Sequence, residues 1–165
     1  MSDRRIPVEP LTREAFAPFG TVIDRTDVAP RPMNAGKARR FHDLARVAVA
    51  DPDGRVVIGF VEADPYLLPL HLSLVERHPL GAQAFIPRND APFLVVVCPD
   101  ECGAPGRPRA FMTAPGQGVC YAIGTWHGVL TPLDEPQDFW VIDRGGPGVN
   151  LEEHTFGEPW IIALG

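Results

Sequence analysis

The chain has 165 residues, of which 45% are apolar and 22% are charged, and these proportions suit one folded domain over residues 1–165. Fifteen Lys and Arg against twenty-one Asp and Glu give a net charge of −6, and no basic run is long enough to follow a phosphate backbone. No apolar stretch approaches the roughly 18 residues of a membrane helix, and no secretory leader is visible. We therefore expect a cytoplasmic protein without nucleic-acid or membrane partners.

The distribution of proline and glycine along the chain predicts an all-β fold. Nineteen prolines and sixteen glycines are spread over the whole length, which leaves little room for helices. One short helix is expected to follow the cap residue Thr12, with Glu14 in its first turn, and to run through Ala15 to Phe19, where Gly20 ends it. Strands are expected at 21–24, 55–62, 70–78, 83–86, 93–98, 110–113, 119–122, 127–131, 138–143 and 160–164, with loops at 25–32 and 99–108. This spacing indicates two packed sheets or a barrel.

The cysteines and glycines indicate neither a disulfide framework nor a phosphate-binding loop. Cys98, Cys102 and Cys120 are odd in number and form no CxxC pair, so we expect reduced, buried or half-buried thiols. No glycine-rich phosphate loop is visible, and no nucleotide cofactor is expected.

The strand over 70–78 changes character along its length. A period of two predicts that Leu70, Leu72, Leu74, Glu76 and His78 share one side of it. Burial of an unpaired carboxylate costs several kcal/mol, so Glu76 and His78 must reach the surface, pair with each other, or line a pocket. An exposed pair at the end of the strand remains open as the simpler alternative.

Two further polar residues complete a possible metal motif. Gln83 shares a strand face with Phe85, and His127 opens a strand after the turn at Gly124. The spacing Glu76-x-His78-x4-Gln83 with a distant G-x-x-His127 is similar to the two-part metal motif of cupins. It predicts a cupin-type double-stranded β-barrel, or jelly roll, with the short helix at its N-terminal end. Gln is a weak neutral ligand, so the need for a metal is left open.

Longer stretches of the chain resemble one family within the cupin superfamily. From Pro10 to Asn150 the sequence looks like the ureidoglycolate lyase family, formerly called ureidoglycolate hydrolase. The stretches that carry the resemblance are FHDL at 41–44, ERHPLGAQAFIP at 76–87, GQGVCY at 116–121, Trp126-His127 and DFWVIDRGG at 138–146. The resemblance implies a homodimer that cleaves (S)-ureidoglycolate to glyoxylate and urea in allantoin breakdown, with a divalent metal, nickel in some members.

The sequence departs from that family at two places. Gly128 stands where a second His often follows Trp126-His127, and Asn34-Ala-Gly36 stands where Asn-Asn-Gly is common. The first departure puts in doubt any mechanism that needs two adjacent imidazoles.

Lysis of ureidoglycolate needs a base for the hydroxyl proton and an acid for the departing urea nitrogen. His78 and His127 titrate in the right range, and Glu76 would serve if partial burial raised its pKa. If a metal is present, Glu76, His78, Gln83 and His127 become its ligands, and proton transfer falls to a second group or to water.

Three residues are candidates for binding the substrate. Arg40 could grip the substrate carboxylate with two parallel hydrogen bonds, although a solvated surface arginine explains it equally well. Asn34 could bind the ureido group, although turn chemistry is an equal explanation. Gln83 is expected in the same cavity as Glu76.

The remaining polar and aromatic residues have structural interpretations. Asp143 and Arg144 are expected to form an ion pair that fixes the turn at 145–146. Core positions are expected for Phe85, Phe111, Tyr121 and Trp126, and structural or surface positions for His42, His71 and His154.

Two rival functions stay open. A cupin with a degenerate site could bind or sense a small molecule without catalysis. An amidohydrolase acting on ureidoglycolate would release ammonia instead of urea, and would need an activated water.

Overall fold

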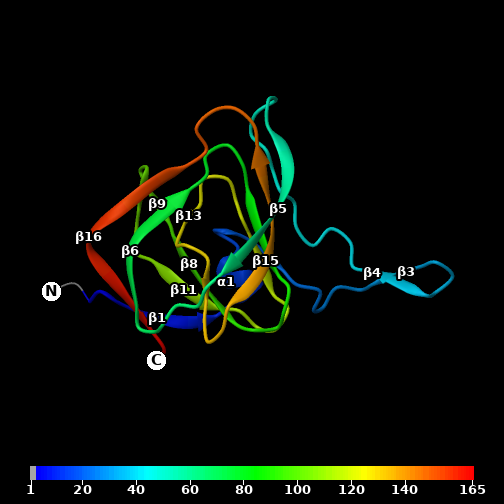
Figure 1. Ribbon diagram of the computed structural model, residues 1–165, viewed down its shortest axis with the longest axis horizontal. Helices are drawn as coiled ribbons and strands as arrows, with labels where there is room; N and C mark the ends of the chain where they lie inside the picture. The colour runs from blue at the N-terminus through cyan, green and yellow to red at the C-terminus, as the bar shows by residue number, and fades with distance from the viewer. Residues whose placement is uncertain (1–2) are drawn as a thin grey trace.

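The computed structural model describes residues 3–165 and confirms the all-β prediction, because strands dominate and one short helix is present (Figure 1). No helix in these residues has the length and apolar character needed to cross a membrane. The elements are β1 (Arg5–Pro10), α1 (Arg13–Phe16), β2 (Gly20–Ile23), β3 (Arg31–Met33), β4 (Ala38–Arg40), β5 (Arg55–Ala63), β6 (Leu70–Arg77), β7 (Gln83–Pro87), β8 (Phe93–Cys98), β9 (Asp100–Glu101), β10 (Ala104–Pro105), β11 (Arg109–Met112), β12 (Gly118–Tyr121), β13 (Trp126–His127), β14 (Thr131–Pro132), β15 (Gln137–Gly145) and β16 (Glu152–Ala163).

Six strands close into a ring in the order β11-β1-β16-β6-β13-β8, and β8 pairs with β11 to complete it. Apolar side chains from all six strands fill its interior, which we call the ring core. Its members are Ile6, Leu72, Val75, Leu94, Val96, Cys98, Ala110, Trp126, Trp160 and Ile162, together with Leu133 from the loop after β14. A closed ring leaves few unpaired strand edges, which stabilises an isolated sheet in water.

A second sheet, β2-β12-β7-β15-β5, packs against one side of the ring. Between them lies the intersheet core, to which Phe16 of α1 also contributes. β8 is buried on both faces because Phe93, Val95 and Val97 belong to the intersheet core while Leu94 and Val96 belong to the ring core. The two packed sheets with a short N-terminal helix confirm the predicted cupin-type barrel.

The helix and most strands lie where the sequence predicts them. Thr12 caps the helix by accepting from the backbone amide of Ala15 at 3.1 Å, and Glu14 lies in the first turn as predicted, although the helix ends at Phe16 and not at Phe19. The single strand predicted over 127–131 is wrong, because β13 ends at His127 and β14 begins at Thr131.

Several strands were missed for physical reasons. β1 carries two prolines, which argue against a strand, but its first half pairs only with β16 and its second half only with β11. β9 and β10 form a small hairpin inside the stretch expected to be a loop. The strand expected at 160–164 is the end of the longer β16.

The prediction that Glu76 and His78 share one face of β6 with the leucines of the strand is wrong. Leu72 and Val75 both belong to the ring core, and residues an odd number apart share a face only where the alternation breaks. β16 bulges opposite this point, between Thr155 and Trp160. Glu76 follows buried Val75, so it faces the opposite side from the ring core. The break turns the polar end of β6 toward the intersheet core.

The cysteines are unpaired, as predicted. Cys98 and Cys120 are buried, and burial raises the pKa of their thiols to about 12 and about 11. Cys102 is exposed in the β9–β10 turn, which corrects the expectation that all three are at least half-buried.

Candidate active site

Three predicted side chains meet where β6 and β13 pair. His127 lies directly opposite Glu76 in this pairing, and His78 follows the end of β6. The candidate ligand atoms of Glu76, His78 and His127 all lie within 4.8 Å of one another. His78 Nε2 is 3.8 Å from Glu76 Oε1, and the two imidazole centroids are 5.3 Å apart. We call these three residues the inner cluster.

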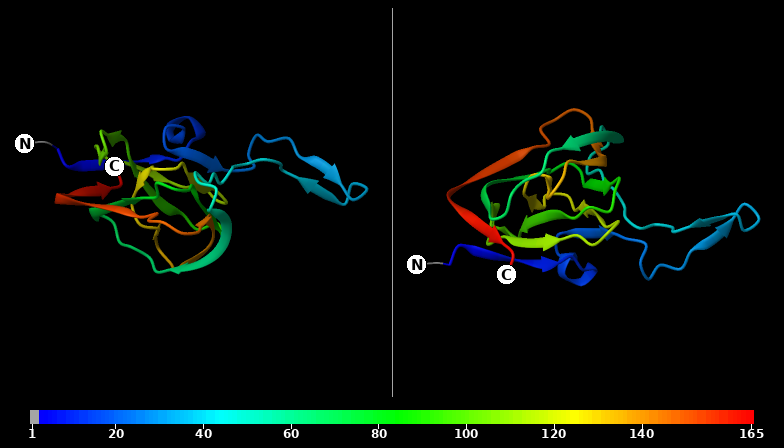
Figure 2. Two further views of the ribbon diagram at one scale, coloured as in Figure 1. Left: turned by 90° about the horizontal axis from the view of Figure 1, so that it is seen from above. Right: turned by 60° about the horizontal axis from the view of Figure 1, so that its bottom comes forward.

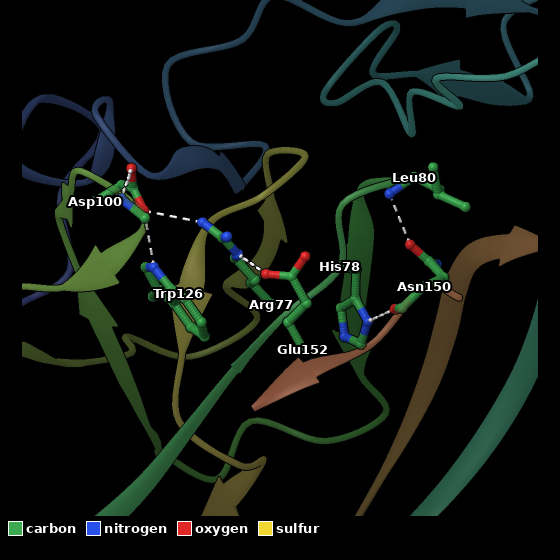
Figure 3. Close-up of polar contacts among 8 residues, drawn as sticks. Arg77, His78, Leu80, Asp100, Trp126, Asn150 and Glu152 are labelled. Atoms are coloured by element: carbon green, nitrogen blue, oxygen red, sulfur yellow. Dashed lines mark hydrogen bonds and ion pairs between the residues drawn. The ribbon is translucent and has the colours of Figure 1, made fainter. Parts of the chain in front are cut away.

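Backbone carbonyls fix both imidazoles in one orientation. His78 Nδ1 lies 2.7 Å from the carbonyl oxygen of Asn150, and His127 Nδ1 lies 3.0 Å from that of Gly128 (Figure 3, for His78). Because a carbonyl can only accept, each Nδ1 carries the hydrogen and each Nε2 keeps a lone pair. Both Nε2 atoms are buried and have no hydrogen-bond partner among the described residues. This is the usual preparation of a metal-binding histidine.

The second sheet supplies two more groups. Tyr121 stacks on His127 with ring centroids 4.2 Å apart and planes 4° apart, and this fixes the imidazole from the side. Gln83 lies opposite Tyr121 in the β7–β12 pairing and donates from Nε2 to Asp143 Oδ2 at 3.2 Å. Its Oε1 is buried and finds no partner within residues 3–165. Gln83 therefore presents a free oxygen from the inner face of the second sheet.

The environment separates the proton affinities of the inner cluster. Burial raises the pKa of Glu76, opposed by nearby His78 and reinforced by Glu153. Burial lowers the pKa of His127 to about 4, against the stabilising hydrogen bond to Gly128 and with a further lowering by His78. At neutral pH His127 is therefore a neutral ligand or acceptor, while Glu76 exchanges protons more readily than an ordinary carboxylate.

The donor set suits a divalent transition metal. Imidazole nitrogens are ligands of borderline hardness that suit first-row transition metals, and the harder carboxylate and amide oxygens can complete the coordination of such an ion. A buried polar atom without a hydrogen-bond partner costs folding free energy. Among the described residues two imidazole nitrogens and one amide oxygen here have no partner, which indicates that the site binds a ligand.

The residue between Glu76 and His78 serves a different purpose. Arg77 faces the other side of β6, where it bonds Glu152 at 2.6 Å and Asp100 at 2.9 Å, and Trp126 Nε1 also donates to Asp100 (Figure 3). A surface cavity of about 550 Å³ lies on this side, and none of the inner cluster lines it. The convergence of side chains, and not cavity size, marks the candidate site.

The absence of a second His at 128 is explained by the fold. A side chain at Gly128 would point at Leu72 and Val96, with a Cβ 3.3 Å from each, and hence into the ring core. An imidazole there would face away from His127. The substitution therefore removes no group from the inner cluster.

The predicted Asp143–Arg144 ion pair is wrong, because neighbouring strand residues face opposite sides. Arg144 instead pairs with Asp51 at 2.7 Å and donates to the carbonyls of Gly146 and Pro147. It still fixes the turn, as predicted. Asp143 faces the site through Gln83, a role the sequence analysis missed.

Two predicted substrate-binding residues lie elsewhere in this chain. Asn34 and Arg40 belong to the β3–β4 hairpin, which projects away from the body that holds β6 and β13 (Figures 1 and 2). The histidines with structural interpretations are placed as expected: His42 and His71 are exposed, and His154 packs edge-on against Trp126.

Comparison with known proteins identifies the family. The family model described as ureidoglycolate lyase matches residues 3–163. The chain is 59% identical to a ureidoglycolate lyase of Chelativorans sp. (strain BNC1) over 98% of both chains. It is 58% identical to one of Mesorhizobium japonicum, over 97% of this chain and 98% of the relative, and 51% identical to one of Rhodobacter capsulatus, over 96% and 98%. The chain, with its cluster of two histidines and a glutamate, belongs to the ureidoglycolate lyase family.

Proposed function

We propose that this chain cleaves (S)-ureidoglycolate to glyoxylate and urea. One structural observation carries the proposal: a half-buried carboxylate and two imidazoles converge, and neither Nε2 atom has a hydrogen-bond partner within residues 3–165. Family membership supplies the substrate that such a site would act on.

The reaction needs only one proton to move. The substrate carries a hydroxyl and a ureido nitrogen on the same carbon, next to a carboxylate. As the hydroxyl loses its proton, its oxygen forms the aldehyde carbonyl, the C–N bond breaks, and the nitrogen takes up a proton to give urea. One group that accepts a proton from oxygen and returns it to nitrogen is sufficient.

Glu76 is the group best suited to carry that proton. Its side chain is 26% exposed, which leaves it open to a substrate, and burial of the remainder raises its pKa above the ordinary value of a glutamate. A carboxylate with a raised pKa is a stronger base than an ordinary glutamate, so it takes up the hydroxyl proton more readily.

His78, His127 and Gln83 would hold a divalent ion beside Glu76, for which the family resemblance suggests nickel; with Glu76 bound as a fourth ligand, the proton would instead pass to a second group or to water. When bound, such an ion supplies Lewis-acid polarisation of the substrate oxygens. His127 keeps its lone pair at neutral pH because its pKa is about 4, and Tyr121 fixes its ring plane.

We further propose a homodimer that works in the cytoplasm. The outer face of β5 and β15 exposes Ile58, Phe60 and Trp140, which are 72%, 43% and 46% accessible, and apolar faces of this kind are typical of subunit contacts. The three free thiols are characteristic of a reducing compartment.

Product analysis tests the function. Purified protein is mixed with racemic ureidoglycolate, and urea, glyoxylate and ammonia are quantified against the spontaneous rate. We expect urea and glyoxylate in equal amounts from half of the racemate. Release of ammonia would identify an amidohydrolase instead, and binding without acceleration would identify a non-catalytic cupin.

A further inference from the structure

An extended arm, residues 25–40, leaves the body of the protein and contains the β3–β4 hairpin (Figures 1 and 2). None of its side chains is buried. The turn residues Asn34, Ala35 and Gly36 have positive φ values of 53°, 54° and 83°. A two-stranded hairpin with no hydrophobic face against a core is marginally stable in water, so this arm needs a surface to rest on.

The charge of the arm is opposite to that of the remaining chain. The arm carries four Arg, one Lys and one Asp. Of fifteen basic and twenty-one acidic residues, ten basic and twenty acidic ones therefore lie outside it. A basic arm is electrostatically complementary to the acidic body of a second copy.

The acidic surface that best matches the arm lies beside the inner cluster, at Glu76 and the exposed Glu153, and we call it the site entrance. Glu153 lies directly opposite Glu76 in the β16–β6 pairing, and two like charges in that position repel each other. Within residues 3–165 neither carboxylate is paired with a Lys or Arg. Arg77, the neighbour of Glu76 on β6, is bound to other carboxylates.

Apolar side chains beside the entrance add a second contact. Val149 and Leu151, which are 78% and 46% accessible, flank Asn150, whose carbonyl holds His78. Met33 at the end of β3 is 41% accessible and would cover such a patch.

We propose that the arm of one copy lies across the acidic site entrance of a second copy and supplies Arg40 and Asn34 to the substrate bound there. A guanidinium binds a carboxylate through two parallel hydrogen bonds, and the Asn amide can both donate to and accept from a ureido group. The substrate part of this inference rests on the proposed lyase function, whereas the contact between copies does not. Each site is then complete only in the dimer.

The contact is tested without substrate by sedimentation equilibrium. The wild-type chain should sediment as a dimer. A variant in which residues 29–40 are replaced by Gly-Ser-Gly should dissociate at least about tenfold more readily, as should the full-length charge reversal R31E/R39E/R40E. Unchanged dimer dissociation constants for both variants, or a monomeric wild type, would overturn the contact.

Active-site complementation tests the exchange of residues between copies. Arg40→Ala has an intact inner cluster and a defective arm, and His127→Ala has the reverse. Each homodimer should lose about 100-fold or more in kcat/KM. Arg5→Ala, which changes an exposed arginine at the start of β1, outside the arm, is the matched control and should retain wild-type activity.

When the two defective variants are co-expressed, half of the dimers are mixed, and each mixed dimer holds one site with an intact cluster and an intact arm. About one quarter of wild-type activity should therefore return. No recovery, from mixed dimers of confirmed mass, would mean that the arm acts on its own chain or not at all. An inactive wild type would reject the proposed function, and the sedimentation result would still decide the contact.

Discussion

Arg77 and Glu76 are neighbours on β6 but belong to two polar clusters, which differ in whether their polar groups have partners. Arg77 faces outward, and each charged group it meets has a partner: Glu152 and Asp100 both bind its guanidinium, and Trp126 donates to Asp100 (Figure 3). Glu76 faces inward, to a cluster in which two imidazole nitrogens have no partner among the described residues. The outer cluster is complete as a structural network, and the inner one is incomplete without something it binds.

His127→Ala should give the largest effect. Loss of a buried lone pair at the centre of the inner cluster should lower kcat/KM for urea release by about two to three orders of magnitude. His154→Ala, which removes an imidazole packed on Trp126 on the outer side, is the control and should stay within about threefold of wild type. An unchanged rate for the first variant, with the fold intact by circular dichroism, would remove the inner cluster from the mechanism.

Glu76→Gln keeps the shape of the side chain and removes its charge and proton exchange. We expect a fall in kcat of about 100-fold. In the wild type, activity should decline as pH falls through the raised pKa of Glu76, because the carboxylate must be ionised to accept the hydroxyl proton. The residual activity of the variant should lack this acidic limb. A limb of the same shape in both proteins would assign it to another group.

The pH dependence of stability should also distinguish the clusters. The pKa of His127 is about 4 in the folded protein and 6.5 in the reference state, so between these values the unfolded chain binds more protons. The contribution of neutral His127 to the free energy of unfolding is complete above pH 6.5 and is lost as the pH falls toward 4. Metal-free wild type should lose up to about 3 kcal/mol more than His127→Gln over this window in urea titrations. Parallel curves would contradict the depressed pKa.

Arg77→Met should give the smallest effect. The two carboxylates that it pairs are 48% and 44% exposed, so solvent screens them, and we expect a loss of about 1 kcal/mol in the free energy of unfolding. Turnover should stay within about threefold of wild type, since the outer network does not touch the inner cluster. A loss of activity comparable to that of the His127 variant would erase the distinction between the clusters.

A structural feature could be predicted from the sequence when residues close together in the chain determine it. Local signals were sufficient for the Thr12 cap, for most strands and for the choice of Glu76, His78 and His127 as candidates. The turn of Glu76 toward the intersheet core was not predictable, because it depends on a bulge in β16, which lies about 80 residues further along the chain.

Partners distant in sequence were missed for the same reason. Arg144 pairs with Asp51, 93 positions away, and no local pattern marks that choice over Asp143. Tyr121 was predicted as a core residue and is one, but its stacking on His127 needs the two sheets to face each other. The projecting arm carries turn residues and charges that, in the sequence alone, look like an ordinary surface loop.

The most direct test of the inner cluster is calorimetric titration of metal-free protein with Ni²⁺, comparing wild type, His127→Ala and Arg77→Met. We predict one ion per chain for wild type and for the Arg77 variant, and binding weakened by at least about 100-fold for the His127 variant. If wild type binds no ion, or if the His127 variant binds as tightly as wild type, the inner cluster is not the metal site described here.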